Sequence, residues 1–117
     1  MATATEYRVI TDRATEITPG SSKDITFTLH TPDASHSVLM FNVVIENPSH
    51  DQPFSFKLNG ETYIYSLGST ARRGLHEVLS ATALRDGSNK LTLSSPAGAG
   101  TGTARFTDIV LLYRRAA

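Results

Sequence analysis

The feature that most restricts the fold of this chain is an alternation of apolar and polar side chains with a period of two. Residues 25–30 (ITFTLH) and 54–59 (FSFKLN) both show it clearly. Successive side chains of a strand point to opposite faces, so these segments predict strands with one face on a core. The run Val38–Ile45 is nearly all apolar. It predicts a central strand that is covered on both faces, at least in part.

Turn-forming residues separate the extended segments at short intervals. Asn59-Gly60 lies between residues 54–58 and 62–67, and Asn-Gly supplies the positive φ angles of a tight hairpin turn, so these two strands are predicted to pair. Residues 95–103 are small and glycine-rich and predict a flexible loop. The other clear turns are Pro19-Gly20, Thr31-Pro32-Asp33, Asn47-Pro48 and Asp86-Gly87.

These segments predict an all-β chain of about eight strands. Many short strands with regular turns favour an antiparallel two-sheet sandwich or a barrel. Because the sequence shows no internal repeat and no linker, we expect residues 1–117 to form one domain. The assignment of the seventh strand is undecided, because residues 76–86 have partial helical spacing and could form a short helix. The predicted strands are 6–10, 15–18, 24–29, 38–46, 53–58, 62–67, 75–79 grouped with 91–93, and 104–114.

Composition excludes several classes of function. Eleven basic residues balance 11 acidic ones, and a neutral domain gains little from the phosphate attraction that drives nucleic-acid binding. The chain has no cysteine, which excludes disulfides and thiolate metal sites. No apolar run of about 18 residues is present, so we expect no membrane contact. Residues 1–5 lack the core of a signal peptide, so we expect an intracellular protein or a module of a longer secreted chain.

The residues that could support catalysis form no recognisable pattern. Serine, histidine and aspartate all occur, but no Gly-x-Ser-x-Gly elbow is present, so we expect no enzyme. The four histidines lack the spacing that marks zinc sites, and solvated surface positions explain them. They are His30, His36, His50 and His76.

The densest group of residues suited to binding lies between positions 59 and 76. Sugars present apolar faces and hydroxyl rims, which suit a flat aromatic ring together with arginine, asparagine or histidine. Tyr63 and Tyr65 share one face of their strand. That face is either exposed to ligand or is the core face with the hydroxyls at its rim, and the pattern does not decide between them. The candidate ligand-binding residues are Asn59, Tyr63, Tyr65, Arg72, Arg73 and His76.

The second half of the chain carries a recognisable series of segments. Arg73-Gly74 is followed by Ser80–Leu84, then by Gly87–Leu93 and finally by Phe106–Tyr113, in which an aspartate stands among apolar residues. This series resembles the galactose-binding-like jelly-roll domains of carbohydrate-binding modules, and is similar to the accessory β-sandwich of rhamnogalacturonan lyases. The resemblance covers less than half of the chain. It implies a jelly-roll sandwich.

The resemblance also implies a metal site. Similar jelly rolls often hold a structural calcium ion between the N-terminal edge and the last strand. Asp108 lies at the matching position, and Glu6 or Glu16 could supply another oxygen. Calcium takes six to eight oxygen ligands, so the alternative is that Asp108 points outward or bonds to a loop.

Two classes of function follow. The first is a non-catalytic carbohydrate-binding module or lectin-like domain for a mono- or oligosaccharide, which predicts a groove with polar side chains. The alternative is a structural or protein-interaction sandwich that self-associates through a sheet face as a homo-oligomer, which predicts an exposed apolar patch.

Overall fold

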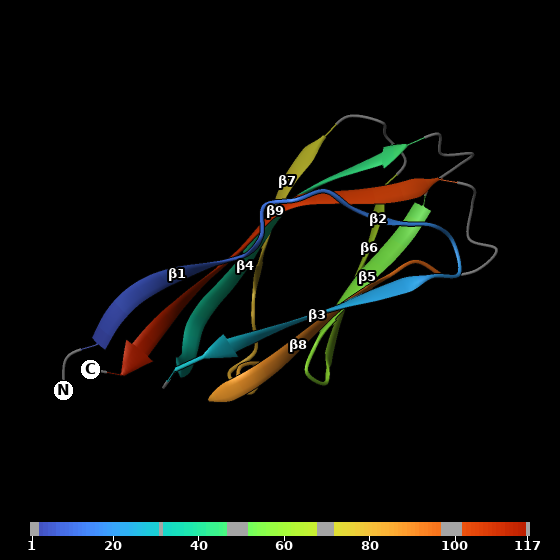
Figure 1. Cartoon of the computed structure of the whole chain (residues 1–117). Coiled ribbons are helices and arrows are strands. Elements are labelled where there is room, and N and C mark those ends of the chain that lie inside the picture. The colour runs from blue at the N-terminus through green and yellow to red at the C-terminus, as the bar shows by residue number, and fades with distance from the viewer. Residues whose placement is uncertain (1–2, 31, 47–51, 68–71, 97–101, 117) are drawn as a thin grey trace.

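The computed structural model describes residues 3–30, 32–46, 52–67, 72–96 and 102–116. The described residues form strands and turns, with no helix among them (Figure 1). They therefore include no helix that could cross a membrane. The predicted turn at Asn47-Pro48 and most of the predicted loop 95–103 lie outside the described residues. The strands are β1 (Thr3–Thr11), β2 (Thr15–Ile17), β3 (Ser22–Leu29), β4 (Pro32–Glu46), β5 (Gln52–Leu58), β6 (Glu61–Leu67), β7 (Arg73–Val78), β8 (Gly87–Ser94) and β9 (Thr103–Ala116).

The nine strands form two antiparallel sheets that face each other, which confirms the predicted all-β sandwich. The first sheet has the order β1-β9-β4-β7, and β2 continues beside β9. The second sheet has the order β3-β8-β5-β6. Every pairing within the two sheets is antiparallel. The outer strands β1 and β7 leave one free edge each on the first sheet.

The core fills the space between the sheets, as the alternating pattern predicts. Phe41 of the first sheet meets Phe56 of the second with ring centroids 5.8 Å apart, and Phe54 meets Phe106 at 5.3 Å, both edge to face. This is a geometry that aromatic pairs favour. Full burial of each such ring contributes about 2–3 kcal/mol. Over residues 37–46 of β4, buried inner side chains alternate with half-buried outer ones, so this part of the strand is covered on its outer face only in part.

The predicted seventh strand is two strands in different sheets. Residues 73–78 pair with β4 in the first sheet, whereas residues 87–94 pair with β3 and β5 in the second. Residues 79–86 form turns and not the alternative helix. The partial helical spacing has another cause, because Leu79, Ala83 and Leu84 are buried where the chain crosses from one sheet to the other.

The predicted hairpin is present, with β5 and β6 paired from Leu58–Glu61 outward. Asn59 takes the positive φ of 58° at the turn, a conformation that asparagine tolerates better than most residues.

The last strand contains a β-bulge that the alternating pattern does not predict. Met40 lies opposite Val110 and Asn42 opposite Thr107, so Asp108 and Ile109 together lie opposite Phe41. Asp108 has a φ of 53°. The extra residue resets the alternation, so that Phe106 and Ile109 both face the core although they are three positions apart.

Candidate functional site

The two predicted tyrosines lie on the core side of β6. The ring of Tyr63 stacks on Phe56 with centroids 4.7 Å apart, and that of Tyr65 stacks on Phe54 at 5.3 Å. Their neighbour Ile64 is 76% exposed on the opposite face. Of the two alternatives that the sequence left open, the core face with hydroxyls at the rim is therefore the one observed.

Both tyrosine hydroxyls have partners in the protein. The Tyr65 hydroxyl donates to Glu77 Oε1 at 2.6 Å, and the Tyr63 hydroxyl accepts from the Ser80 N–H at 3.1 Å. Burial, and secondly the hydrogen bond to Glu77, raise the pKa of Tyr65 above its ordinary value. These bonds join β6 to β7 and to the following turn, and so close one side of the sandwich.

Asn59 is also used within the fold. Its Nδ2 donates to the Ala83 carbonyl at 2.6 Å and to Asn89 Oδ1 at 2.9 Å, and its Oδ1 accepts from the Lys90 N–H at 2.9 Å. The side-chain amide thus has partners at both ends and binds the hairpin turn to the crossing segment.

The remaining three candidates lie near or on β7. Arg72 and Arg73 are exposed at its start, and His76 is exposed on the outer face of the first sheet, opposite Met40. The structure therefore does not gather the six predicted ligand-binding residues into one site. It separates them into an internal set and an outer set.

The three predicted calcium ligands are also distributed along β9. Glu6 lies opposite Tyr113, Glu16 opposite Arg105, and Asp108 between them in the bulge. Glu6 accepts from the Tyr113 hydroxyl at 3.1 Å. Glu16 lies 3.9 Å from the guanidinium of Arg105. Within the described residues, no three histidine or acidic side chains group as metal ligands would.

A groove of about 380 Å³ crosses the outer face of the first sheet beside the bulge. Asn42 Nδ2 donates to Asp108 Oδ2 at 3.2 Å across its floor. The exposed imidazole of His76 supplies a third polar group from β7. The side chains that line the groove are those of Met40, Asn42, His76, Asp108 and Val110.

Gly74 leaves the groove open on its β7 side. A Cβ atom at this position would lie 3.2 Å from Asn42 Oδ1, which is tighter than an ordinary contact. The glycine of the Arg73-Gly74 pair therefore gives the Asn42 amide room beside Asp108. The groove joins polar groups from β4, β7 and β9 over an apolar floor of Met40 and Val110.

Asn42 was not among the residues predicted from the sequence. Its signal was present, because it is the single polar residue within Val38–Ile45. A polar residue in an otherwise apolar strand requires a partner or an exposed position. The partner, Asp108, is 66 positions away, so its identity required the sheet register.

Exposed apolar side chains lie beside the groove on the same face. Tyr7 is 71% exposed, Val78 66% and Val9 49%. Cross-strand pairing places them in two rows that run across β1, β9, β4 and β7. One row is Tyr7, Leu112, Val38 and Val78, and the next is Val9, Val110, Met40 and His76.

The outer face of the second sheet has a different character. A hollow of about 300 Å³ is lined there by Lys57, Asn59 and a polar cluster that consists of Asp24, Lys90 and Thr92. In that cluster Asp24 accepts from the Thr92 hydroxyl at 2.7 Å and lies 3.5 Å from Lys90. The hydrogen bond from Thr92, followed by the charge of Lys90, holds the pKa of Asp24 below its ordinary value. The pairs in this cluster are exposed, and such pairs contribute little to stability.

No family model and no curated protein sequence matches this chain. Solved structures match it in fold. CBM35 from Cellvibrio japonicus Abf62 aligns with 97% of this chain and 97% of its own, at 13% identity and a TM-score of 0.53. Dimeric latent PorU from Porphyromonas gingivalis aligns with 97% of this chain at 11% identity and a TM-score of 0.65. A ruminal GH26 endo-beta-1,4-mannanase aligns with 86% of it at 14% identity and a TM-score of 0.52.

These similarities define a class of fold. The chain spans 13% of the PorU chain and 19% of the mannanase chain, but nearly all of the CBM35 chain. Together with the two antiparallel sheets, they show a jelly-roll fold like that of carbohydrate-binding modules, as the sequence resemblance implied. At these identities the similarity concerns the fold alone.

Proposed function

We propose that this chain is a non-catalytic carbohydrate-binding module whose ligand lies in the outer groove of the first sheet. The observation that carries the proposal is the Asn42–Asp108 pair, which presents an amide and a carboxylate beside His76 over an apolar floor. Sugars combine apolar C–H faces with hydroxyls that both donate and accept. The groove offers a surface of both kinds.

The polar groups in the groove are suited to hydroxyl recognition. The Asp108 carboxylate accepts from sugar hydroxyls, the Asn42 amide donates and accepts, and the His76 imidazole does both when neutral. The similarity in fold to CBM35 over 97% of each chain supports this class of function. The lack of catalysis is part of the proposal, because glycoside hydrolysis commonly uses two carboxylates flanking the bond, and Asp108 is the one carboxylate lining the described groove.

Titration calorimetry against a panel of neutral and acidic oligosaccharides tests the proposal. We expect saturable binding that Asn42→Ala and His76→Ala each weaken by about tenfold, since the loss of one or two ligand hydrogen bonds costs about 1–2 kcal/mol. Lys57→Ala, on the outer face of the other sheet, is the matched control and should bind as the wild type does.

Arg73→Ala separates this groove from the site predicted from sequence. The groove proposal expects this variant to bind normally, because Arg73 does not line the groove. If Arg73→Ala abolishes binding while Asn42→Ala and His76→Ala do not, the ligand lies at the start of β7 and the groove is the wrong site. If none of the oligosaccharides in the panel binds, the proposal of carbohydrate binding is rejected.

The exposed apolar rows favour one second candidate, the protein-interaction sandwich that self-associates through a sheet face. Tyr7 and Val78 are both more than half exposed on the same face, and patches of this kind often mark contact surfaces. Val78→Lys tests it, because a charge in that row would abolish association through the face and leave a sugar ligand in the groove.

A further inference from the structure

The N-terminal strand β1 forms one free edge of the first sheet, at the opposite end of the strand order from β7. Among the described strands it pairs only with β9, so the backbone groups of its other side have no strand partner (Figure 1). The edge is long, and no proline or glycine interrupts Thr3–Thr11. The register irregularity in β1 falls near its end, between Val9 and Thr11. A long regular edge of this kind is a template for a further strand.

Charges on the inner side of an edge strand commonly block such pairing. Here the two charges, Glu6 and Arg8, have opposite signs and flank Tyr7. If a second β1 pairs antiparallel with Tyr7 opposite Tyr7, each Glu6 lies opposite the other copy's Arg8. Directly opposite side chains in an antiparallel pair have Cβ atoms about 5 Å apart. The charge pattern therefore favours a second copy of the same strand.

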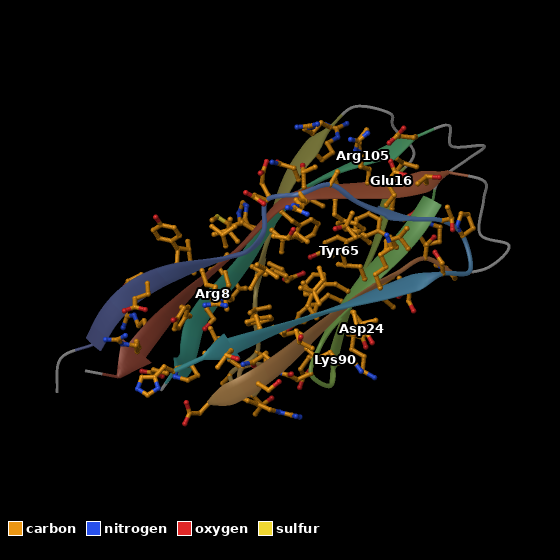
Figure 2. All side chains as sticks on the ribbon, viewed as in Figure 1. Arg8, Glu16, Asp24, Tyr65, Lys90 and Arg105 are labelled. Carbon is orange, nitrogen blue, oxygen red and sulfur yellow. The ribbon has the colours of Figure 1, made fainter. Side chains whose placement is uncertain are left out.

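The surroundings of the two charges fit this arrangement. Glu6 lies 3.2 Å from Arg115, whereas Arg8 is exposed and forms no ion pair with another described residue. Figure 2 shows Arg8 on the side of β1 that faces β3. On the outer side, the 71% exposed Tyr7 would stack against its counterpart.

We propose that two copies of this chain associate through antiparallel pairing of their β1 edges, centred on Tyr7, with two Glu6–Arg8 ion pairs across the join. The first sheets of both copies then form one continuous sheet. The groove stays open, because it lies over β4, β7 and β9, so sugar binding and dimer formation can fail independently. One strand edge is a small interface, and we expect a concentration-dependent dimer.

Sedimentation equilibrium of the full chain and of two variants tests the proposal. Arg8→Glu places Glu opposite Glu at both ends of the join, and Glu6→Arg places Arg opposite Arg. Each is expected to lower the association constant by at least about tenfold, since like charges directly opposite destabilise a pair. A mixture of the two variants restores two ion pairs and should form a heterodimer at least as tightly as the wild type dimerises.

Two control variants and one folding measurement separate this edge from other causes. Arg85→Glu makes the same change of net charge in the distant turn and should dimerise normally. Val78→Lys lies on the same sheet face but on the opposite edge, and should also leave the dimer intact. Thermal unfolding shows whether Glu6→Arg folds, since it loses the contacts of Glu6 with Tyr113 and Arg115. If Glu6→Arg does not fold, Arg8→Glu alone tests the proposal, because Arg8 is exposed.

Each outcome decides for or against the β1 edge. A wild-type chain that stays monomeric at all concentrations overturns the proposal. So does a dimer that Val78→Lys abolishes and Arg8→Glu leaves unchanged, which would place the contact on the sheet face. Loss of the dimer in Arg8→Glu, together with recovery in the mixture, supports antiparallel pairing centred on Tyr7.

Discussion

At the scale of single residues, the buried amide of Asn89 organises the segment where the chain crosses between the sheets. Its Oδ1 accepts from the Arg85 N–H and from Asn59 Nδ2, both at 2.9 Å. Its Nδ2 donates to the carbonyls of Arg85 and Gly87. The side chain is 1% exposed, so no solvent replaces these partners if it is removed.

Asn89→Ala is therefore expected to lower the free energy of unfolding by about 2–4 kcal/mol, because it leaves buried donors and acceptors without partners. Urea unfolding followed by circular dichroism measures the change. Ser88→Ala, at the exposed neighbouring position, is the control and should shift stability by less than about 0.5 kcal/mol. Equal stability of the two variants would show that the amide network is not needed.

The ionisation of the Tyr65 hydroxyl makes the free energy of unfolding depend on pH in the alkaline range. Its pKa is raised from 10.0 in the folded state, first by burial and then by the bond to Glu77. The folded state thus holds this proton more tightly than the unfolded state. The resulting stabilisation is complete below about pH 10 and is lost as the pH rises above that value.

Tyr65→Phe removes this ionisation along with the hydrogen bond to Glu77. We expect the variant to be less stable than the wild type at neutral pH by about 1 kcal/mol. Its stability should then fall less steeply than that of the wild type above about pH 10. Urea unfolding across this range measures both effects, and parallel pH profiles for the two proteins would contradict the assigned cause.

At the scale of elements, the bulge in β9 determines which side chains reach the groove. It places Thr107 and Asp108 in succession on the outer side while the flanking Phe106 and Ile109 stay buried. Asp108 adopts a φ of 53°, which asparagine and aspartate accept more readily than branched residues. Asp108 therefore has two roles in the bulge: its backbone adopts the positive φ, and its side chain places a carboxylate at the groove.

Substitutions at Asp108 separate these two roles. Asp108→Val is expected to be less stable than Asp108→Gly by about 1–2 kcal/mol, because valine is strained at this φ and glycine is not. Both variants lose the carboxylate and should lose sugar binding together. Denaturant unfolding measures the difference, and equal stabilities would mean that the bulge rearranges when Asp108 is replaced.

At the scale of the whole molecule, the two outer faces differ in a way that directs function to one of them. The second sheet presents hydroxyl and charged side chains such as Lys57, Lys90 and Thr92. The first presents exposed apolar rows with the Asn42–Asp108 pair beside them. Both proposals therefore use the first sheet, one through its groove and one through its β1 edge. On the side of the sandwich away from β1, Tyr63 and Tyr65 join β6 to β7 and to the turn after it, and so close the gap between the two sheets.

The sequence by itself determined the class of fold and much of the strand pattern. Alternation, turn residues and the Asn59-Gly60 hairpin are local properties, and local sterics and burial are sufficient to produce them. The bulge in β9 was not among these predictions, because it appears only in the register of β4 on β9. The resemblance carried by residues 73–113 pointed to the jelly roll that the structural similarities show.

Tertiary structure alone decided which residues share a surface. Tyr63 and Tyr65 lie on the core side because they are the hairpin partners of Phe56 and Phe54; the parity of β6 by itself left their side undecided. Asn42 met Asp108 through the register of β4 on β9, across 66 positions of chain. The physical reason is that alternation divides each strand into two faces, whereas the assembled sheets determine which face meets the core and which neighbours lie beside it.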